Sequence, residues 1–89
     1  MKKNPEYLIR RVADRQVIVP IGKAAENFVG MIAVNGTGAF LWEQLENEQT
    51  PETLVDALTQ QYEVSREQAM KDVLTFLDKL RSVGALVEE

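Results

Sequence analysis

The sequence predicts a small α+β domain in which three short strands are followed by three helices. Two observations lead to this prediction. In the first third of the chain, apolar side chains fall in short runs that are rich in β-branched and aromatic residues, as in strands. Beyond residue 38 they recur three or four positions apart, as on one face of a helix. With 89 residues and 45% hydrophobic content, the chain suffices for one packed domain, which we expect to span residues 1–89.

The predicted strands cover residues 7–12, 16–20 and 28–34. A turn at 13–15 joins the first two, and a loop over 21–27 precedes the third. Pro20 has no amide hydrogen to donate, so it should end its strand or lie at a sheet edge. Gly30 interrupts the third apolar run and predicts a bulge or a close approach of the backbone.

The first two predicted helices follow a turn at 35–38. In the first, which covers residues 39–46, Leu41 and Leu45 are four positions apart and share one face. The second begins after Thr50, a favourable N-cap residue, and Pro51 suits the first helical position because no amide donor is needed there.

The third predicted helix is the longest and ends at about residue 83. Ser65 and Gln68 predict a capping box at its start, and Gly84 is a natural C-terminal cap. Residues 85–87 can add a short strand or a tail. Two short helices and a long one, with tight connections, are typical of a winged-helix-like three-helix unit; here it would pack beside an N-terminal three-stranded antiparallel β-sheet.

The apolar face of the third helix is wider than burial against one neighbour requires. At about 100° per residue, four residues cluster near Ala69 and form a core stripe: Val73, Phe76, Leu80 and Val83. Met70, Leu74 and Leu77 extend the apolar arc to one side, to roughly 180° in total. These three side chains either pack inside the monomer or line a groove beside the sheet, where methionine suits a surface that accepts varied partners.

The third strand is the candidate edge of such a groove. Residues 29–34 carry no charge, whereas exposed edges are usually protected by lysine, proline or a bulge, and only Gly30 offers such protection. Either this strand is central, or its edge is occupied by a partner. An extended peptide could add there as a strand, with the helix supplying side-chain pockets.

Composition excludes several classes of site. The chain has no cysteine and no histidine, so thiolate sites, disulfides, and the commonest general base and metal ligand are missing. We therefore expect no catalytic residues, no bound metal and no cofactor. No apolar run approaches the roughly 20 residues that span a bilayer, and no signal peptide is visible, so we expect a cytoplasmic protein without a membrane partner.

Charge is divided unevenly along the chain. Residues 1–23 hold six basic and two acidic residues, a balance of +4, whereas residues 24–89 hold four basic and twelve acidic residues, a balance of −8. These are either solvated faces or a basic surface that attracts an acidic partner. The net charge of −4 disfavours nucleic acid, and the basic residues of the third helix form no single face: Arg66, Lys71, Lys79 and Arg81.

Three stretches together resemble the coenzyme PQQ synthesis protein D family. Residues 34–43, VNGTGAFLWE, are similar to its LNxTGxxIW signature, with Gly36 and Val34 as mild departures. Residues 49–62 are similar to its T-x-E-x-L…L…Y helix. Residues 72–87 are similar to its closing D-V-x-x-F-L…L…G-L-V pattern, and the resemblance runs from about Leu8 onward.

The resemblance implies a RiPP recognition element, a non-catalytic domain that binds the leader segment of a ribosomally made precursor peptide. The leader adds to the third strand, lies against the third helix, and is presented to a modifying enzyme, often a radical SAM enzyme. Nothing ties the chain to PQQ itself as the product. The implied peptide-binding residues are Val29, Met31, Ile32, Ala33, Val34, Met70, Leu74, Leu77 and Arg81.

Two other functions stay open at this point. One is a structural module that forms a homodimer, in which the third strand pairs with its twin. The other is a winged-helix DNA-binding protein, which would need a basic recognition helix.

Overall fold

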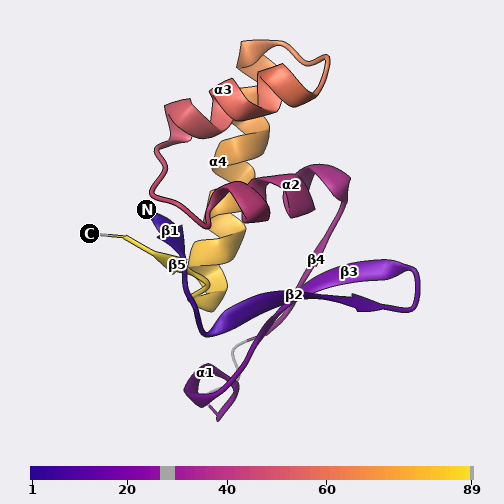
Figure 1. Cartoon of the computed structure of the whole chain (residues 1–89), viewed down its shortest axis with the longest axis vertical. Helices are drawn as coiled ribbons and strands as arrows, with labels where there is room; N and C mark the ends of the chain where they lie inside the picture. The colour runs from indigo at the N-terminus through magenta and orange to yellow at the C-terminus, as the bar shows by residue number, and fades with distance from the viewer. Residues whose placement is uncertain (27–29, 89) are drawn as a thin grey trace.

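The three longer helices stack above a small antiparallel sheet, whose hairpin extends to the right, and a short helix lies below the sheet (Figure 1). The computed structural model describes residues 1–26 and 30–88. The elements are β1 (Lys2–Lys3), β2 (Tyr7–Val12), β3 (Arg15–Pro20), α1 (Lys23–Glu26), β4 (Ile32–Val34), α2 (Gly36–Gln44), α3 (Pro51–Gln61), α4 (Arg66–Val83) and β5 (Leu86–Val87). The predicted fold class is confirmed.

The main sheet has the strand order β2-β3-β4 and is antiparallel throughout. Val12 and Arg15 form the last pair of the β2–β3 hairpin, so the turn contains only two residues. The first of them, Ala13, has φ 57°, the left-handed conformation that a tight hairpin turn requires. On the other side of β3, Ile32 lies opposite Ile18 and Val34 lies opposite Gln16. Within the described residues β4 is therefore an edge strand, which the sequence left open.

Four local predictions differ from the structure. The predicted helix over 39–46 begins earlier, because α2 starts at Gly36, inside the predicted turn at 35–38, and it ends at Gln44. The predicted loop over 21–27 contains the four-residue helix α1, which is too short to leave a periodic apolar pattern. The predicted third strand begins at residue 28, but β4 begins at Ile32, and residues 28 and 29 lie outside the described residues. Gly30 has φ 136°, a conformation that favours glycine, and so accounts for the late start of the strand. The two-residue strand β1 was not predicted; it pairs with the predicted β5.

Side-chain caps determine where the helices begin. Asn35 accepts a hydrogen bond from the Gly38 amide at 2.9 Å and opens α2. Thr50 forms the predicted N-cap of α3, in a capping box with Thr53. Ser65 accepts from the Gln68 amide at 3.1 Å at the start of α4, while the Gln68 side chain donates to Asp72 at 2.9 Å. None of the described helices is long and apolar enough to cross a membrane.

The core lies between the sheet and the three longer helices. Its fully buried members include Ile18, Leu41, Trp42, Leu45, Leu54, Leu58, Val73, Leu77 and Leu80. Leu77 has no exposed surface, so it packs inside the monomer rather than lining a groove, which corrects that part of the predicted site. The apolar arc of α4 is wide because the helix packs against both the sheet and α3.

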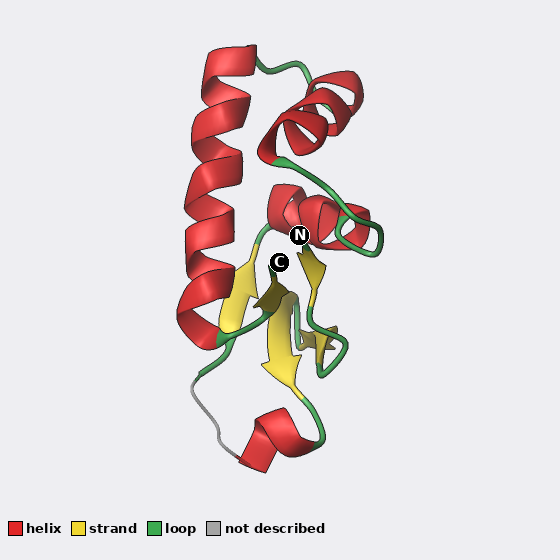
Figure 2. Cartoon of the chain, turned by 90° about the vertical axis from the view of Figure 1, so that its left-hand side faces the viewer, coloured by secondary structure: helices red, strands yellow, loops and turns green. Residues whose placement is uncertain are grey.

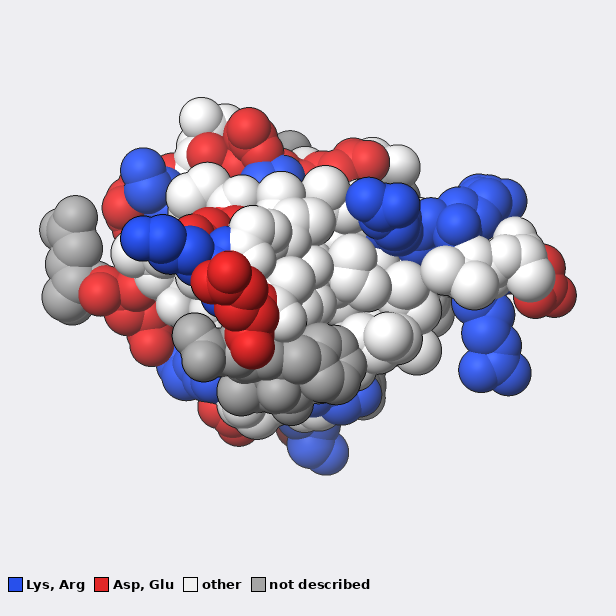
Figure 3. Space-filling model, turned by 90° about the horizontal axis from the view of Figure 1, so that it is seen from below, with Lys and Arg blue, Asp and Glu red and all other residues white. Residues whose placement is uncertain are grey.

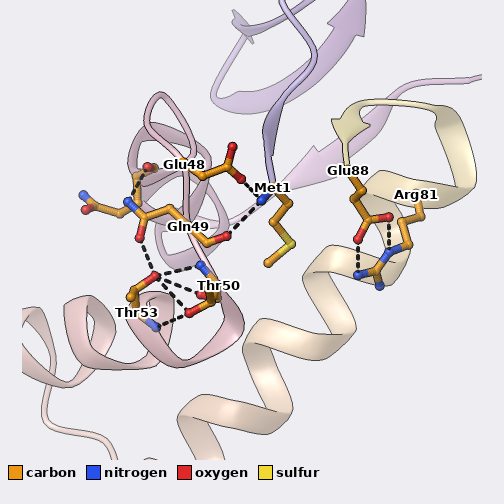
Figure 4. A network of polar contacts seen from close by, with 8 residues as sticks. Met1, Glu48, Gln49, Thr50, Thr53, Arg81 and Glu88 are labelled. Carbon is orange, nitrogen blue, oxygen red and sulfur yellow. Dashed lines mark hydrogen bonds and ion pairs between the residues drawn. The ribbon is translucent and has the colours of Figure 1, made fainter.

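The strand pair β1–β5 joins the two ends of the described chain to the α2–α3 connection. The Met1 carbonyl accepts from the Gln49 amide at 2.8 Å, and the Met1 ammonium contacts the Glu48 carboxylate (Figure 4). Lys3 lies 5.3 Å from the centroid of the buried Trp42 ring, a cation–π geometry. The Lys3 side chain thus packs over the indole of Trp42.

The left-handed C-cap of α4 generates a testable prediction. Gly84 has φ 79°, and Ala at this position should lower the free energy of unfolding by about 1 kcal/mol because a Cβ disfavours that conformation. The matched control is Gly36→Ala at the start of α2, where a Cβ would meet nothing within 4 Å. This control should leave stability unchanged or raise it. Urea denaturation followed by circular dichroism measures both variants, and equal effects would contradict the assignment.

Candidate functional site

The hydrogen-bonding pattern of β3 shows which main-chain groups remain at the sheet edge. The Ile21 amide donates to the Glu6 carbonyl at 2.7 Å, which makes this pair a hydrogen-bonded one. Hydrogen-bonded and non-hydrogen-bonded pairs alternate along an antiparallel ladder. Counting back along β3, Gln16 and Ile18 therefore direct their N–H and C=O groups towards β4 rather than β2.

The same alternation leaves the main-chain N–H and C=O of one β4 residue without a partner in the described part of the sheet. Ile32 and Val34 are opposite Ile18 and Gln16, so their main-chain groups are used within the sheet. Ala33, between them, directs its N–H and C=O away from the sheet, and its side chain is exposed. Ala33 therefore offers one donor and one acceptor to an incoming strand.

The two edges of the sheet differ in charge. On β2, the opposite edge, Arg10 and Arg11 are exposed, and lysine or arginine at an edge discourages strand pairing. Figure 3 shows Lys and Arg side chains gathered where the β2–β3 hairpin projects. The described residues of β4 carry no charge. Of the two edges, β4 is thus the one that can accept another strand.

Helix α4 lies alongside β4 and runs antiparallel to it (Figure 2). At one end, a Cβ on Gly30 would lie 3.7 Å from Val83 Cγ1. At the other end, a Cβ on Gly38 would lie 3.1 Å from Val34 Cβ and 3.3 Å from Phe76 Cε1. The missing side chain at Gly38 therefore lets α2, β4 and α4 meet at one point.

A cleft opens beside this meeting point, and we call it the β4–α4 cleft. It consists of two adjoining hollows of about 90 and 260 Å³, and both are lined by Asn35, Gly38, Phe76 and Lys79. The smaller hollow is also lined by Ile32, Ala33 and Val34. The larger one is also lined by Thr37, Leu41, Asp72 and Thr75. The free edge of β4 is thus next to a partly apolar cleft.

The structure brings together only part of the predicted site. The strand residues Ile32, Ala33 and Val34 line the cleft, and Met31, 57% exposed, directly precedes them. Val29 lies outside the described residues.

The predicted helix residues lie elsewhere on α4. Leu74 is 45% exposed but sits about 140° around the helix from Lys79, away from the cleft. Met70 packs partly buried against the core. Neither residue lines the cleft, so the predicted helix residues and the β4–α4 cleft lie on different flanks of α4.

The Arg81 side chain, also a predicted peptide contact, forms ion pairs within the chain. Its guanidinium makes two hydrogen bonds to the Glu88 carboxylate, at 2.7 and 2.9 Å (Figure 4). A third hydrogen bond goes to the Asp78 carboxylate at 3.0 Å. The hydrogen bonds to Glu88 raise the pKa of Arg81, and those from Arg81 lower the pKa of Glu88. In this arrangement Arg81 ties β5 to α4.

Sequence reasoning missed the polar flank of α4. Asp72, Thr75 and Lys79 line the cleft, but a search for apolar periodicity passes over polar side chains. Phe76 was assigned to the core stripe by its periodicity; in the structure it is buried, at 7% exposure, and it also lines the cleft. Among residues 1–26 and 30–88, no three acidic side chains lie close enough together to hold a metal ion.

Two solved structures are similar to this chain. One, described as TbiB1 in complex with the TbiA(beta) leader peptide, has a TM-score of 0.75 and 24% identity, and the match covers 100% of this chain and 98% of that one. The other, described as lasso peptide synthetase B1 complexed with the leader peptide, has a TM-score of 0.71 and 22% identity, with 98% and 96% covered. At these identities the likeness establishes the fold. Comparison with curated protein sequences finds no match.

The family model described as coenzyme PQQ synthesis protein D (PqqD) matches residues 15–86. This range extends from the start of β3 into β5, so it includes β4, α2 and α4, which form the cleft. The chain therefore belongs to the coenzyme PQQ synthesis protein D family.

Proposed function

We propose that this chain is a RiPP recognition element, which binds the leader segment of a ribosomally made precursor peptide as an additional strand on β4. The observation that carries the proposal is the free N–H and C=O of Ala33 on an uncharged edge next to the β4–α4 cleft. Two further findings support it: membership of the family, and two structural neighbours that are described as leader-peptide complexes.

Strand addition divides recognition into two parts. A peptide residue opposite Ala33 exchanges two main-chain hydrogen bonds with it, each contributing about 0.5–1.5 kcal/mol net. These bonds are independent of peptide sequence. The neighbouring peptide side chains enter the cleft against Phe76 and Lys79, and this part distinguishes one peptide from another.

We further propose that the domain performs no chemistry of its own. Histidine and cysteine are absent from the chain, and no nucleophile signature is visible in the sequence. A separate modifying enzyme, a radical SAM enzyme for instance, would act on the presented peptide in the cytoplasm, where ribosomes make it. Residues 1–89 would serve as one recognition domain, without nucleic acid or membrane as partner.

An amide NMR titration tests the proposal directly. The probe is the leader of the short peptide gene nearest to the gene for this chain, added to the ¹⁵N-labelled protein. The largest shifts should fall on residues 32–35 and 72–79, because these two ranges contain the strand and helix residues that line the cleft. Relaxation times without peptide distinguish monomer from homodimer. Shifts confined to β2, or a dimer already paired through β4, would contradict the proposal.

Proline at the free edge should block strand addition without unfolding the domain. Ala33→Pro removes the outward N–H but no hydrogen bond of the sheet, so leader affinity should fall about tenfold at similar stability. The control is Arg11→Pro, whose N–H also points outward, but on the β2 edge. Isothermal titration calorimetry and urea denaturation measure both variants. Loss of affinity in the control alone would place the peptide on β2.

Substitutions at two adjacent residues of α4 test which flank of this helix binds the peptide. Thr75 lines the cleft, whereas Leu74, about 100° around the helix, does not. Thr75→Trp should fill the cleft and weaken leader binding about tenfold or more. Leu74→Trp should change affinity less than about twofold. Because both positions are exposed, the free energy of unfolding of each variant should fall by no more than about 0.5 kcal/mol. The reverse order of affinities would move the site to the Met70–Leu74 flank.

A further inference from the structure

Lys79 is the charged residue of α4 that lines the smaller hollow, next to the free strand edge. Of the side chains that line the smaller hollow, it alone carries a charge. No ion pair involves Lys79 within residues 1–26 and 30–88. An unpaired cation at this position is notable because residues 24–89 carry a charge of −8. Its ammonium is therefore available to a ligand.

The packing of α4 places Lys79 near the middle of β4. Val83, one helical turn further on, is next to Gly30, and Phe76, about one turn back, is next to Val34. Lys79 lies between these two contacts along the helix and lines the hollow together with Ile32.

Strand geometry decides which peptide side chains reach this helix. In a strand added to β4, the residue opposite Ala33 points to the same face as the Ala33 side chain, away from the core. The peptide residues opposite Ile32 and Val34 point to the face that packs against α4. One of them meets Lys79, and the other, two residues away, meets Phe76.

Asp72 makes one end of the cleft unfavourable for an acidic peptide side chain. It lines the larger hollow, seven residues before Lys79 and about 10 Å from it along the helix axis. A peptide carboxylate would be attracted near Lys79 and repelled near Asp72. The two charges therefore favour one placement of an acidic peptide over placements shifted along the cleft.

We propose that the β4–α4 cleft selects a peptide with an Asp or Glu facing Lys79 and an apolar residue, two positions away, facing Phe76. This inference rests on the proposed function and adds the chemical class of the peptide. An exposed ion pair of this kind contributes about twofold to fivefold in affinity, and reversing the charge of Lys79 adds repulsion, for about tenfold in total.

Selection from a display library of randomised twelve-residue peptides tests the inference without knowledge of the natural ligand. The intact wild-type protein should enrich peptides with Asp or Glu two positions from an apolar residue. Lys79→Glu should enrich Lys or Arg at the acidic position instead. The control, Lys71→Glu, changes the same charge on an exposed residue of α4 that lies outside the cleft, and it should retain the wild-type preference.

Each outcome has a separate meaning. Enrichment of peptides with no acidic preference, or a preference that Lys79→Glu leaves unchanged, overturns the inference but leaves strand addition intact. No enrichment by any of the three proteins overturns the proposed function and the inference together. An enriched peptide, resynthesised with Asn or Gln at its acidic position, should bind wild type about twofold to fivefold more weakly and Lys79→Glu more tightly. Equal losses for both proteins would also overturn the inference.

Discussion

The contact between α2, β4 and α4 at Gly38 determines the architecture of the candidate site. Because this glycine has no Cβ, the Val34 and Phe76 side chains approach the α2 backbone, and the edge strand is held beside the long helix. The Asn35 cap keeps Gly38 in place by accepting its amide hydrogen. Without this approach the strand edge and the polar flank of α4 would not border one cleft. A single local packing constraint thus joins the main-chain part of the site to its side-chain part.

Much of the fold was predictable because the relevant signals are local. Caps such as Thr50 and Gly84 fix helix ends through hydrogen bonds or backbone conformations that depend on a few residues. The β2–β3 hairpin follows from two short apolar runs separated by a turn. In contrast, the strand order depends on long-range packing, so the sequence could not place β4 at the edge. Helix α1 and strand β1 were too short to leave a pattern.

The candidate site was predictable in one half only. The sequence singled out the uncharged stretch around Ala33 as either a central strand or an occupied edge, and the structure places it at the edge. The helix half was not predictable, because a wide apolar arc has two explanations that the sequence does not separate. Leu77 serves packing, whereas the cleft flank of α4 is polar and resembles any solvated surface, as Lys79 and Thr75 do. Which flank faces the strand follows only from how α4 crosses the sheet.

The shortness of β4 has a kinetic consequence for the proposed strand addition. With three residues, of which one has outward-facing main-chain groups, the strand can form few sequence-independent bonds. Differences in affinity between related complexes arise mostly in the dissociation rate, so a short edge implies a brief residence time for each peptide. A domain that must receive a substrate, wait for its modification and then accept the next one benefits from rapid release. A longer edge would hold the product and slow every later cycle.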